Sequence, residues 1–132
     1  MNFLVIATGL LILAGFSIPG NYVYSVRRSP SFLSFTLSDP MIHVYALGTF
    51  TVVLGWSRHK EKSRIFSLSK VALYSLLYGI FIEVYQIALP WRSFELMDIF
   101  WDGVGVLAGL VTIVVLSKVY KRRILAGAEY EK

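Results

Sequence analysis

The segment IEVYQIALPWRSFELMDIFWD, residues 82–102, places a dense group of polar side chains between two apolar runs. The run Val71–Ile82 leads into it, and the run Val104–Leu116 follows it. Pro90 breaks the segment, because proline lacks an N–H and cannot continue a helix. Its polar and charged members are Glu83, Gln86, Arg92, Glu95, Asp98 and Asp102. The segment therefore predicts two hydrophobic helices that meet at a short loop and carry polar groups at their adjoining ends.

The composition of the whole chain favours a membrane protein. Of the 132 residues, 56% are hydrophobic and only 16% are charged. A soluble domain of this length could not bury so much apolar surface, whereas a small polytopic membrane protein exposes it to lipid. The chain has no cysteine, which excludes disulfides and thiolate metal sites. We therefore expect a single membrane domain over residues 1–132.

Four apolar segments are the expected helices, and they cover residues 3–18, 41–56, 71–89 and 97–119. A bilayer span takes about 20 residues, which the last two provide and the first two approach with the help of flanking residues. A backbone in lipid must satisfy its own hydrogen bonds, so each span is predicted to be a helix. The first segment could also be a cleaved signal peptide, but it lacks a basic start, and we expect it to be retained. The predicted fold class is all-α: a polytopic membrane protein with a bundle of four transmembrane helices.

The basic residues predict how the chain crosses the membrane. Ten of the thirteen lysine and arginine residues lie in the loop after the second segment or in the C-terminal tail. The loops at 21–39 and 90–96 hold the other three. Because basic loops stay in the cytoplasm, we expect a multi-pass protein of the cell membrane with both termini cytoplasmic. The net charge of +5 then reflects contact with anionic lipid, and nucleic acid is not an expected partner.

Three pairs of polar residues fall at the same predicted membrane face. They are Asp39 with His43, Glu83 with Gln86, and Asp98 with Asp102. Each pair is separated by three or four positions, so its members share one side of a helix. Ionisable groups at this depth usually face a bundle interior or a wet cavity rather than lipid. We therefore expect a polar pocket that opens to the outer face between the last three helices.

Gly105 and Gly109 continue the stripe of Asp98 and Asp102 along the fourth helix. Two glycines four positions apart let a neighbouring helix approach closely, because neither carries a side chain. Packing inside this bundle is the simpler use of the pair. Contact with a partner membrane protein through the same strip is the alternative that the sequence leaves open.

Taken in order, these residues resemble the motifs of the VanZ-like family of teicoplanin-resistance-associated membrane proteins. The pattern is D-x3-H, then E-x2-Q-x3-P-x-R-x5-D, then a polar residue four positions later and a glycine-rich helix. It is carried by Asp39, His43, Glu83, Gln86, Pro90, Arg92, Asp98, Asp102 and Gly105, and the similarity runs from about Asp39 to Thr112. Two positions depart from the family pattern: Pro40 replaces a frequent lysine, and Asp102 replaces the usual asparagine.

The resemblance implies a multi-helix bacterial or archaeal protein of the cell envelope that modulates susceptibility to the glycopeptide teicoplanin. In this interpretation the outward-facing pocket binds a lipid headgroup or a lipid-linked envelope precursor. The expected binding residues are Asp39, Gln86, Arg92, Asp98 and Asp102. The expected partners are the lipid bilayer and an anionic lipid or lipid-linked precursor.

The residues themselves leave binding and catalysis both open. Glu83 and His43 are the candidates for acid–base chemistry on an envelope lipid, since an ionisable group inside a membrane is a functional candidate. Arg92 could steer an anionic group of such a substrate. The structural alternatives are a Glu83 that pairs with Arg92 or accepts from Gln86, and a His43 that is satisfied by Asp39. A third interpretation is a purely structural or partner-binding membrane subunit.

His43, Glu83, Asp98 and Asp102 also form an oxygen-rich set with one histidine. Such a set would suit magnesium, manganese or zinc. No recognised metal motif accompanies these four residues, so the expected site holds no metal and no cofactor.

Overall fold

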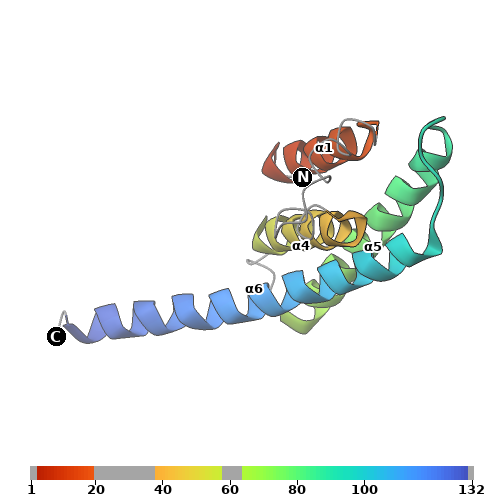
Figure 1. The fold of residues 1–132 in the computed structure, drawn as a ribbon. Coiled ribbons are helices and arrows are strands. Elements are labelled where there is room, and N and C mark those ends of the chain that lie inside the picture. Colours follow the sequence, from red (N-terminus) through yellow and green to blue (C-terminus); the bar gives the residue numbers. More distant parts are fainter. Residues whose placement is uncertain (1–2, 20–37, 58–63, 131–132) are drawn as a thin grey trace.

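The computed structural model describes residues 3–19, 38–57 and 64–130, and these residues form four helices and no strand (Figure 1). The helices are α1 (Phe3–Phe16), α4 (Asp39–Ser57), α5 (Arg64–Ile87) and α6 (Leu96–Tyr130). The expected all-α class is therefore confirmed for the described part of the chain. The basic residues Arg27, Arg28, Arg58, Lys60, Lys62 and Lys132 lie outside it.

Proline and serine residues set several of the helix ends. The carbonyl of Ser38 accepts a hydrogen bond from the backbone N–H of Ile42 at 3.0 Å, which closes the first turn of α4. Pro40 lies inside that turn, where a helix has no use for its missing N–H. The last turn after α5 tightens through a bond from the N–H of Leu89 to the carbonyl of Gln86, and Pro90 then ends it. These local signals place the helix ends close to the polar residues.

Two helices are longer than their apolar runs. The sequence predicted helices at 71–89 and 97–119, whereas α5 begins at Arg64 and α6 continues to Tyr130. Apolar periodicity marks the part of a helix in contact with lipid or core, and it stops where basic residues begin. Lysine and arginine are nonetheless good helix formers, so the helix continues through them. With 35 residues, α6 is roughly 50 Å long at the usual rise per residue.

The helices pack in layers along the bundle. α4 and α5 each contact the other three helices, while the backbones of α1 and α6 do not approach each other within the described residues. One apolar layer consists of Val5, Phe50, Leu54 and Val71. The next consists of Phe16, Leu47, Ile82 and Val106. A layer of buried polar residues lies next to this second apolar layer. Leu47, Ile82 and Val106 each lie within one turn of a buried polar residue on their own helix.

Glycines hold α4 and α6 together. A Cβ atom on Gly105 would lie 2.6 Å from the carbonyl oxygen of Val44, and one on Gly109 would lie 2.8 Å from that of Gly48. The two backbones therefore touch directly, along a line of residues 44, 48, 105 and 109 that we call the glycine seam. The prediction that Gly105 and Gly109 face a neighbouring helix is confirmed, and the neighbour is α4.

Two described helices are long and apolar enough to cross a bilayer, over Leu68–Ile87 of α5 and Leu96–Tyr120 of α6. Only 28% and 22% of these spans is buried inside the molecule, unlike the core helix of a soluble protein. α1 is shorter, with 14 residues, and packs on α4 and α5 through Val5 and Phe16. Of the four expected spans, α5 and α6 thus qualify as candidate membrane spans by length and composition.

Candidate functional site

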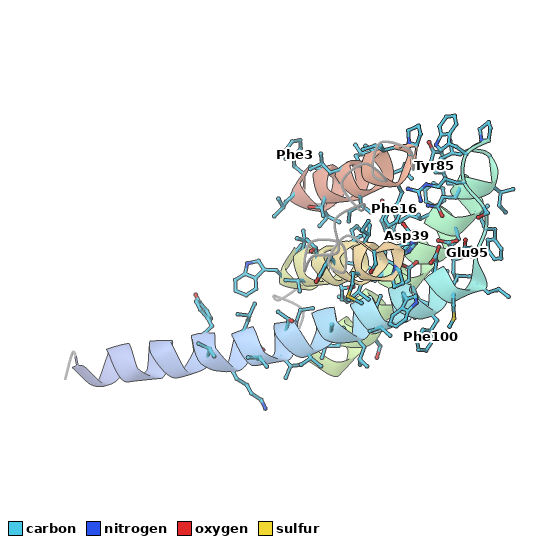
Figure 2. The ribbon with its side chains drawn as sticks, viewed as in Figure 1. Phe3, Phe16, Asp39, Tyr85, Glu95 and Phe100 are labelled. Carbon is cyan, nitrogen blue, oxygen red and sulfur yellow. The ribbon has the colours of Figure 1, made fainter. Side chains whose placement is uncertain are left out.

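The polar residues meet at one end of the bundle. We call this the polar end: α1 and α5 finish there, at Phe16 and Ile87, and α4 and α6 begin there, at Asp39 and Leu96. Figure 2 shows Phe16, Asp39, Tyr85 and Glu95 at this end, with Phe3 at the opposite end of α1. Alternating helix directions bring segments distant in sequence to the same place, as the order of apolar segments predicted.

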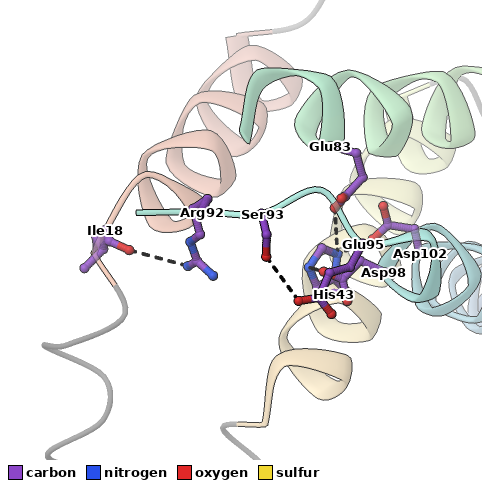
Figure 3. A network of polar contacts seen from close by, with 8 residues as sticks. All are labelled: Ile18, His43, Glu83, Arg92, Ser93, Glu95, Asp98 and Asp102. Carbon is purple, nitrogen blue, oxygen red and sulfur yellow. Dashed lines mark hydrogen bonds and ion pairs between the residues drawn. The ribbon is translucent and has the colours of Figure 1, made fainter. Parts of the chain in front are cut away.

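His43 is the centre of a buried cluster. Its side chain is 3% exposed, and its Nδ1 lies 2.8 Å from Oδ1 of Asp102 and 3.9 Å from Oε1 of Glu83. On the other side of the ring, Nε2 lies 3.4 Å from Oδ2 of Asp98. These four residues, which we call the His43 cluster, come from α4, α5 and α6 (Figure 3). An ionised carboxylate only accepts, so Nδ1 donates to Asp102 in this arrangement.

A glycine on α5 makes room for Asp102. A Cβ atom on Gly79 would lie 2.5 Å from Oδ2 of Asp102 and 3.1 Å from its Cγ. The carboxylate of Asp102 therefore fits between α4 and α5 only because position 79 has no side chain. Oδ2 is buried there and has no hydrogen-bond partner among the described residues. One of the two carboxylate oxygens of Asp102 is thus without a partner among the described residues.

Glu83 is the most deeply buried member of the cluster, with a side chain that is 0% exposed. Neither of its carboxylate oxygens has a hydrogen-bond partner in the described part of the chain. The backbone N–H of Glu95 faces Glu83 without reaching hydrogen-bond geometry. An unpaired carboxylate in this position is costly, because burial removes its water and nothing replaces it.

Phe16 covers the cluster on the side of α1. Its ring centroid lies 4.6 Å from that of His43, and its side chain is itself buried. Asp98 is the only partly exposed member of the cluster, at 14% of its side chain. The described residues therefore enclose most of the cluster, and Asp98 marks the side on which it approaches solvent. That a pocket opens from it to the outer face stays a prediction. The enclosure arises because α1 packs over the ring, which the polar pattern did not indicate.

The loop between α5 and α6 binds the end of α1. Nε1 of Trp91 donates to the carbonyl of Ser17 at 3.2 Å, and Nη2 of Arg92 approaches the carbonyl of Ile18 at 3.4 Å. We call these two contacts the α1 clasp. Within the described residues Arg92 forms no ion pair with Glu83, so the Glu83–Arg92 pair considered from sequence is wrong. Its Nε is buried and lacks a partner there.

Comparison with protein families gives one match, to the family described as VanZ/LLP1, over residues 3–117. This match covers most of the chain, including α1, α4, α5 and the apolar part of α6. The chain belongs to the VanZ/LLP1 family. Comparisons with curated proteins and with solved structures found no match. The VanZ/LLP1 family consists of membrane proteins, which agrees with the two candidate spans.

In this VanZ/LLP1 protein the predicted site residues separate into two groups. His43, Glu83, Asp98 and Asp102 converge, and Gln86 is buried beside them at 2% exposure. Asp39, in contrast, is exposed in the first turn of α4, although it was expected to share the inner face with His43. Its place at the very start of the helix, where a carboxylate favours the helix dipole, needs no inward orientation.

Two residues of the site were missed by sequence reasoning. Gly79 lies four positions before Glu83 on α5, so extending the polar stripe by one turn would have found it. Phe16 carries no comparable signal, because an aromatic residue near the end of an apolar helix resembles its neighbours. Chemically, the His43 cluster can transfer a proton, accept hydrogen bonds from a bound group, or coordinate a cation.

Proposed function

We propose that this protein crosses the cell membrane with all four helices, keeps both termini in the cytoplasm, and binds the headgroup of an envelope lipid at its polar end. Either a lipid or a lipid-linked envelope precursor would present such a headgroup. Exposed apolar side chains on α5 and α6, such as Phe81 and Leu107, support contact with lipid over much of the bundle. The excess of basic residues away from the polar end supports an outward orientation for that end.

The observation that carries the proposal is the buried and unsatisfied carboxylate of Glu83. Nothing in the packing of α5 requires a charge there, since Ile82 and Val71 fill equivalent buried positions with apolar side chains. Such a group is stabilised if something outside the described residues completes its contacts. A headgroup that enters beside Asp98 would do so at the depth where lipid headgroups meet hydrocarbon.

Arg92 supports binding of an anionic headgroup. It stands at the polar end, its Nε has no acceptor among the described residues, and its Nη2 makes only a long contact to Ile18. Guanidinium binds phosphate well, because its donors match two phosphate oxygens at once. Capture of a lipid-linked precursor at this place would also give the protein a route to altering glycopeptide susceptibility, since such drugs act on the outer face of the envelope.

A membrane-embedded enzyme is the second candidate, and one observation favours it. Nδ1 of His43 is held by Asp102 at 2.8 Å, which fixes the orientation of the imidazole as an acid–base residue requires. Glu83 stands on the same side of the ring, at 3.9 Å. In this reading the bound lipid is a substrate of Glu83 and His43 rather than a ligand.

Native mass spectrometry of the gently purified full chain tests both candidates. We expect an anionic lipid to stay bound to the wild type and to the matched control Glu95→Gln, which neutralises an exposed carboxylate at the same end. Arg92→Ala should lose that lipid, with retention reduced by roughly 10-fold or more. Accumulation of the intact lipid on Glu83→Gln would favour the enzyme. The absence of any specific lipid from every form would overturn the proposal.

A further inference from the structure

Three side chains of the His43 cluster present their donor atoms to one small volume. One ligand atom from each of His43, Glu83 and Asp102 lies within 4.8 Å of the other two, and all three side chains are buried. We propose that these residues bind a divalent cation, of the kind that accepts imidazole and carboxylate together, such as Mn²⁺ or Zn²⁺. The inference concerns the same site as the proposed headgroup binding and deepens it.

The spacing of the donor atoms fits coordination. Ligands about 2.1 Å from one ion lie roughly 3.0–3.5 Å from each other, for octahedral or tetrahedral geometry. Nδ1 of His43 lies 2.8 Å from Asp102 and 3.9 Å from Glu83, so the two distances bracket this range. Small rotations of two carboxylates would bring all three donors to one ion. An ion would take the place of the proton that now lies between Nδ1 and Oδ1.

A second observation points independently to a ligand. Both oxygens of Glu83 and Oδ2 of Asp102 are buried, and none has a hydrogen-bond partner in the described chain. Buried carboxylates are ordinarily paired with a cation or coordinate a metal. Arg92 is the basic side chain at this end of the described chain, and it is directed to Ile18 instead (Figure 3). The positive charge that the cluster needs is therefore not supplied by Arg92.

Asp98 completes the arrangement from outside. It lies 3.4 Å from Nε2, the ring nitrogen that would not touch the ion. A histidine that ligates through one nitrogen usually donates the other N–H to a carboxylate, which fixes the ring and strengthens the ligand. Partial exposure of Asp98, at 14%, also gives the site an access route from the polar end. Asp98 is thus a positioning residue rather than a ligand.

The cation would explain how an acidic cluster can serve an anionic headgroup. Glu83, Asp98 and Asp102 alone would repel a phosphate, whereas a bound divalent ion reverses the local field. With Arg92 on one side and the ion on the other, the polar end would hold phosphate from two directions. This last step rests on the proposed function, while the cation site itself does not.

Pulsed electron paramagnetic resonance with Mn²⁺ is the direct test, on the chelator-treated full chain in detergent. We expect one tightly bound Mn²⁺ per chain, with a ¹⁴N coupling from His43 in the spectrum of the wild type and displacement by Zn²⁺. The same coupling should remain in His59→Gln, which removes the other histidine of the chain, so the test does not depend on a cluster variant that fails to fold. Manganese bound only at millimolar concentration, or bound without a nitrogen coupling, would overturn the proposal.

Variants assign the ligands. Asp102→Asn and Glu83→Gln should each weaken Mn²⁺ binding by about 100-fold or more, and Asp98→Asn by roughly 10-fold, as for a second-layer carboxylate. The exposed control Glu95→Gln should bind Mn²⁺ like the wild type. Each variant is accepted only if it elutes as the wild type does in size-exclusion chromatography. Equal Mn²⁺ affinity in Asp102→Asn and Glu95→Gln would contradict the assignment.

Lipid retention with and without chelator separates the two proposals. Binding of Mn²⁺ with ¹⁴N coupling but no retained lipid would support the cation site and overturn headgroup binding. Lipid retained equally in chelator, with no Mn²⁺ binding, would support headgroup binding and overturn the cation site. Lipid that is retained only with Mn²⁺ present would support both.

Discussion

The segment 82–102 divides into two regions with opposite properties. In the α1 clasp, the donors of Trp91 and Arg92 reach carbonyls of Ser17 and Ile18, and these contacts lie near the surface. In the His43 cluster, carboxylates are buried and three of their oxygens have no partner among the described residues. The fold therefore gives acceptors to the Trp91 N–H and to Nη2 of Arg92, and it gives no donor to these three carboxylate oxygens. A polar group whose contacts are complete is explained by the fold, while one whose contacts are incomplete indicates a ligand.

The largest effect is expected from a change that separates the helices carrying the cluster. Gly105→Ala would place a Cβ atom 2.6 Å from the carbonyl oxygen and 3.0 Å from the Cα of Val44, both backbone atoms that cannot turn aside. We expect a loss of about 2–3 kcal/mol in the free energy of unfolding. Chemical unfolding of the detergent-solubilised protein measures it.

Gly103→Ala is the matched control on the same helix. A Cβ atom there would meet nothing within 4 Å, so only the better helix propensity of alanine remains. Its unfolding free energy should be unchanged or up to about 1 kcal/mol higher. Equal losses in the two variants would mean that the glycine seam is not what joins α4 to α6.

An intermediate effect on the free energy of unfolding is expected for Glu83→Gln. In chelator, Glu83→Gln removes one of several clustered negative charges and adds an amide that can donate to a neighbouring carboxylate. The free energy of unfolding should therefore rise by about 1 kcal/mol. Added Mn²⁺ should stabilise the wild type and not the variant. A variant less stable than the wild type in chelator would show that Glu83 stabilises the fold and is not held there for a ligand.

The smallest effect is expected in the α1 clasp. Trp91→Phe keeps an aromatic ring but loses the N–H that binds the carbonyl of Ser17. One partly exposed hydrogen bond contributes about 0.5–1 kcal/mol, and we expect a loss of that size in unfolding free energy. Mn²⁺ affinity should stay as in the wild type, measured by the same titration. A large loss of Mn²⁺ affinity would show that cation binding in the His43 cluster depends on the α1 clasp.

Much of the cluster could be predicted from sequence, because two regular properties determine it. Helix periodicity puts Asp98 and Asp102 on one side of α6, and alternating helix directions bring them level with His43 and Glu83. Neither step requires knowledge of side-chain partners. Ionisable side chains within a membrane usually face the interior of the bundle, and the burial of His43 and Glu83 agrees with this.

The clasp and the helix ends could not be predicted in the same way. Arg92 meets a backbone carbonyl just after the end of α1, and every residue offers one, so no sequence pattern distinguishes Ile18 as the partner. Asp39 remains on the surface because the first turn of a helix accepts a carboxylate in any direction. The extra turns of α5 and α6 follow from the helix propensity of basic residues, which apolar periodicity does not measure.

The glycine seam also determines how the site can change shape. Backbone meets backbone along α4 and α6, so we expect these two helices to move together and to hold His43, Asp98 and Asp102 at their mutual spacing. At Gly79, in contrast, the nearest atoms that a Cβ on α5 would meet belong to the side chain of Asp102. We therefore expect α5 to tilt more easily than α4 and α6, which would carry Glu83 toward or away from those two helices. Occupancy of the polar end would then displace the opposite end of α5, at Arg64.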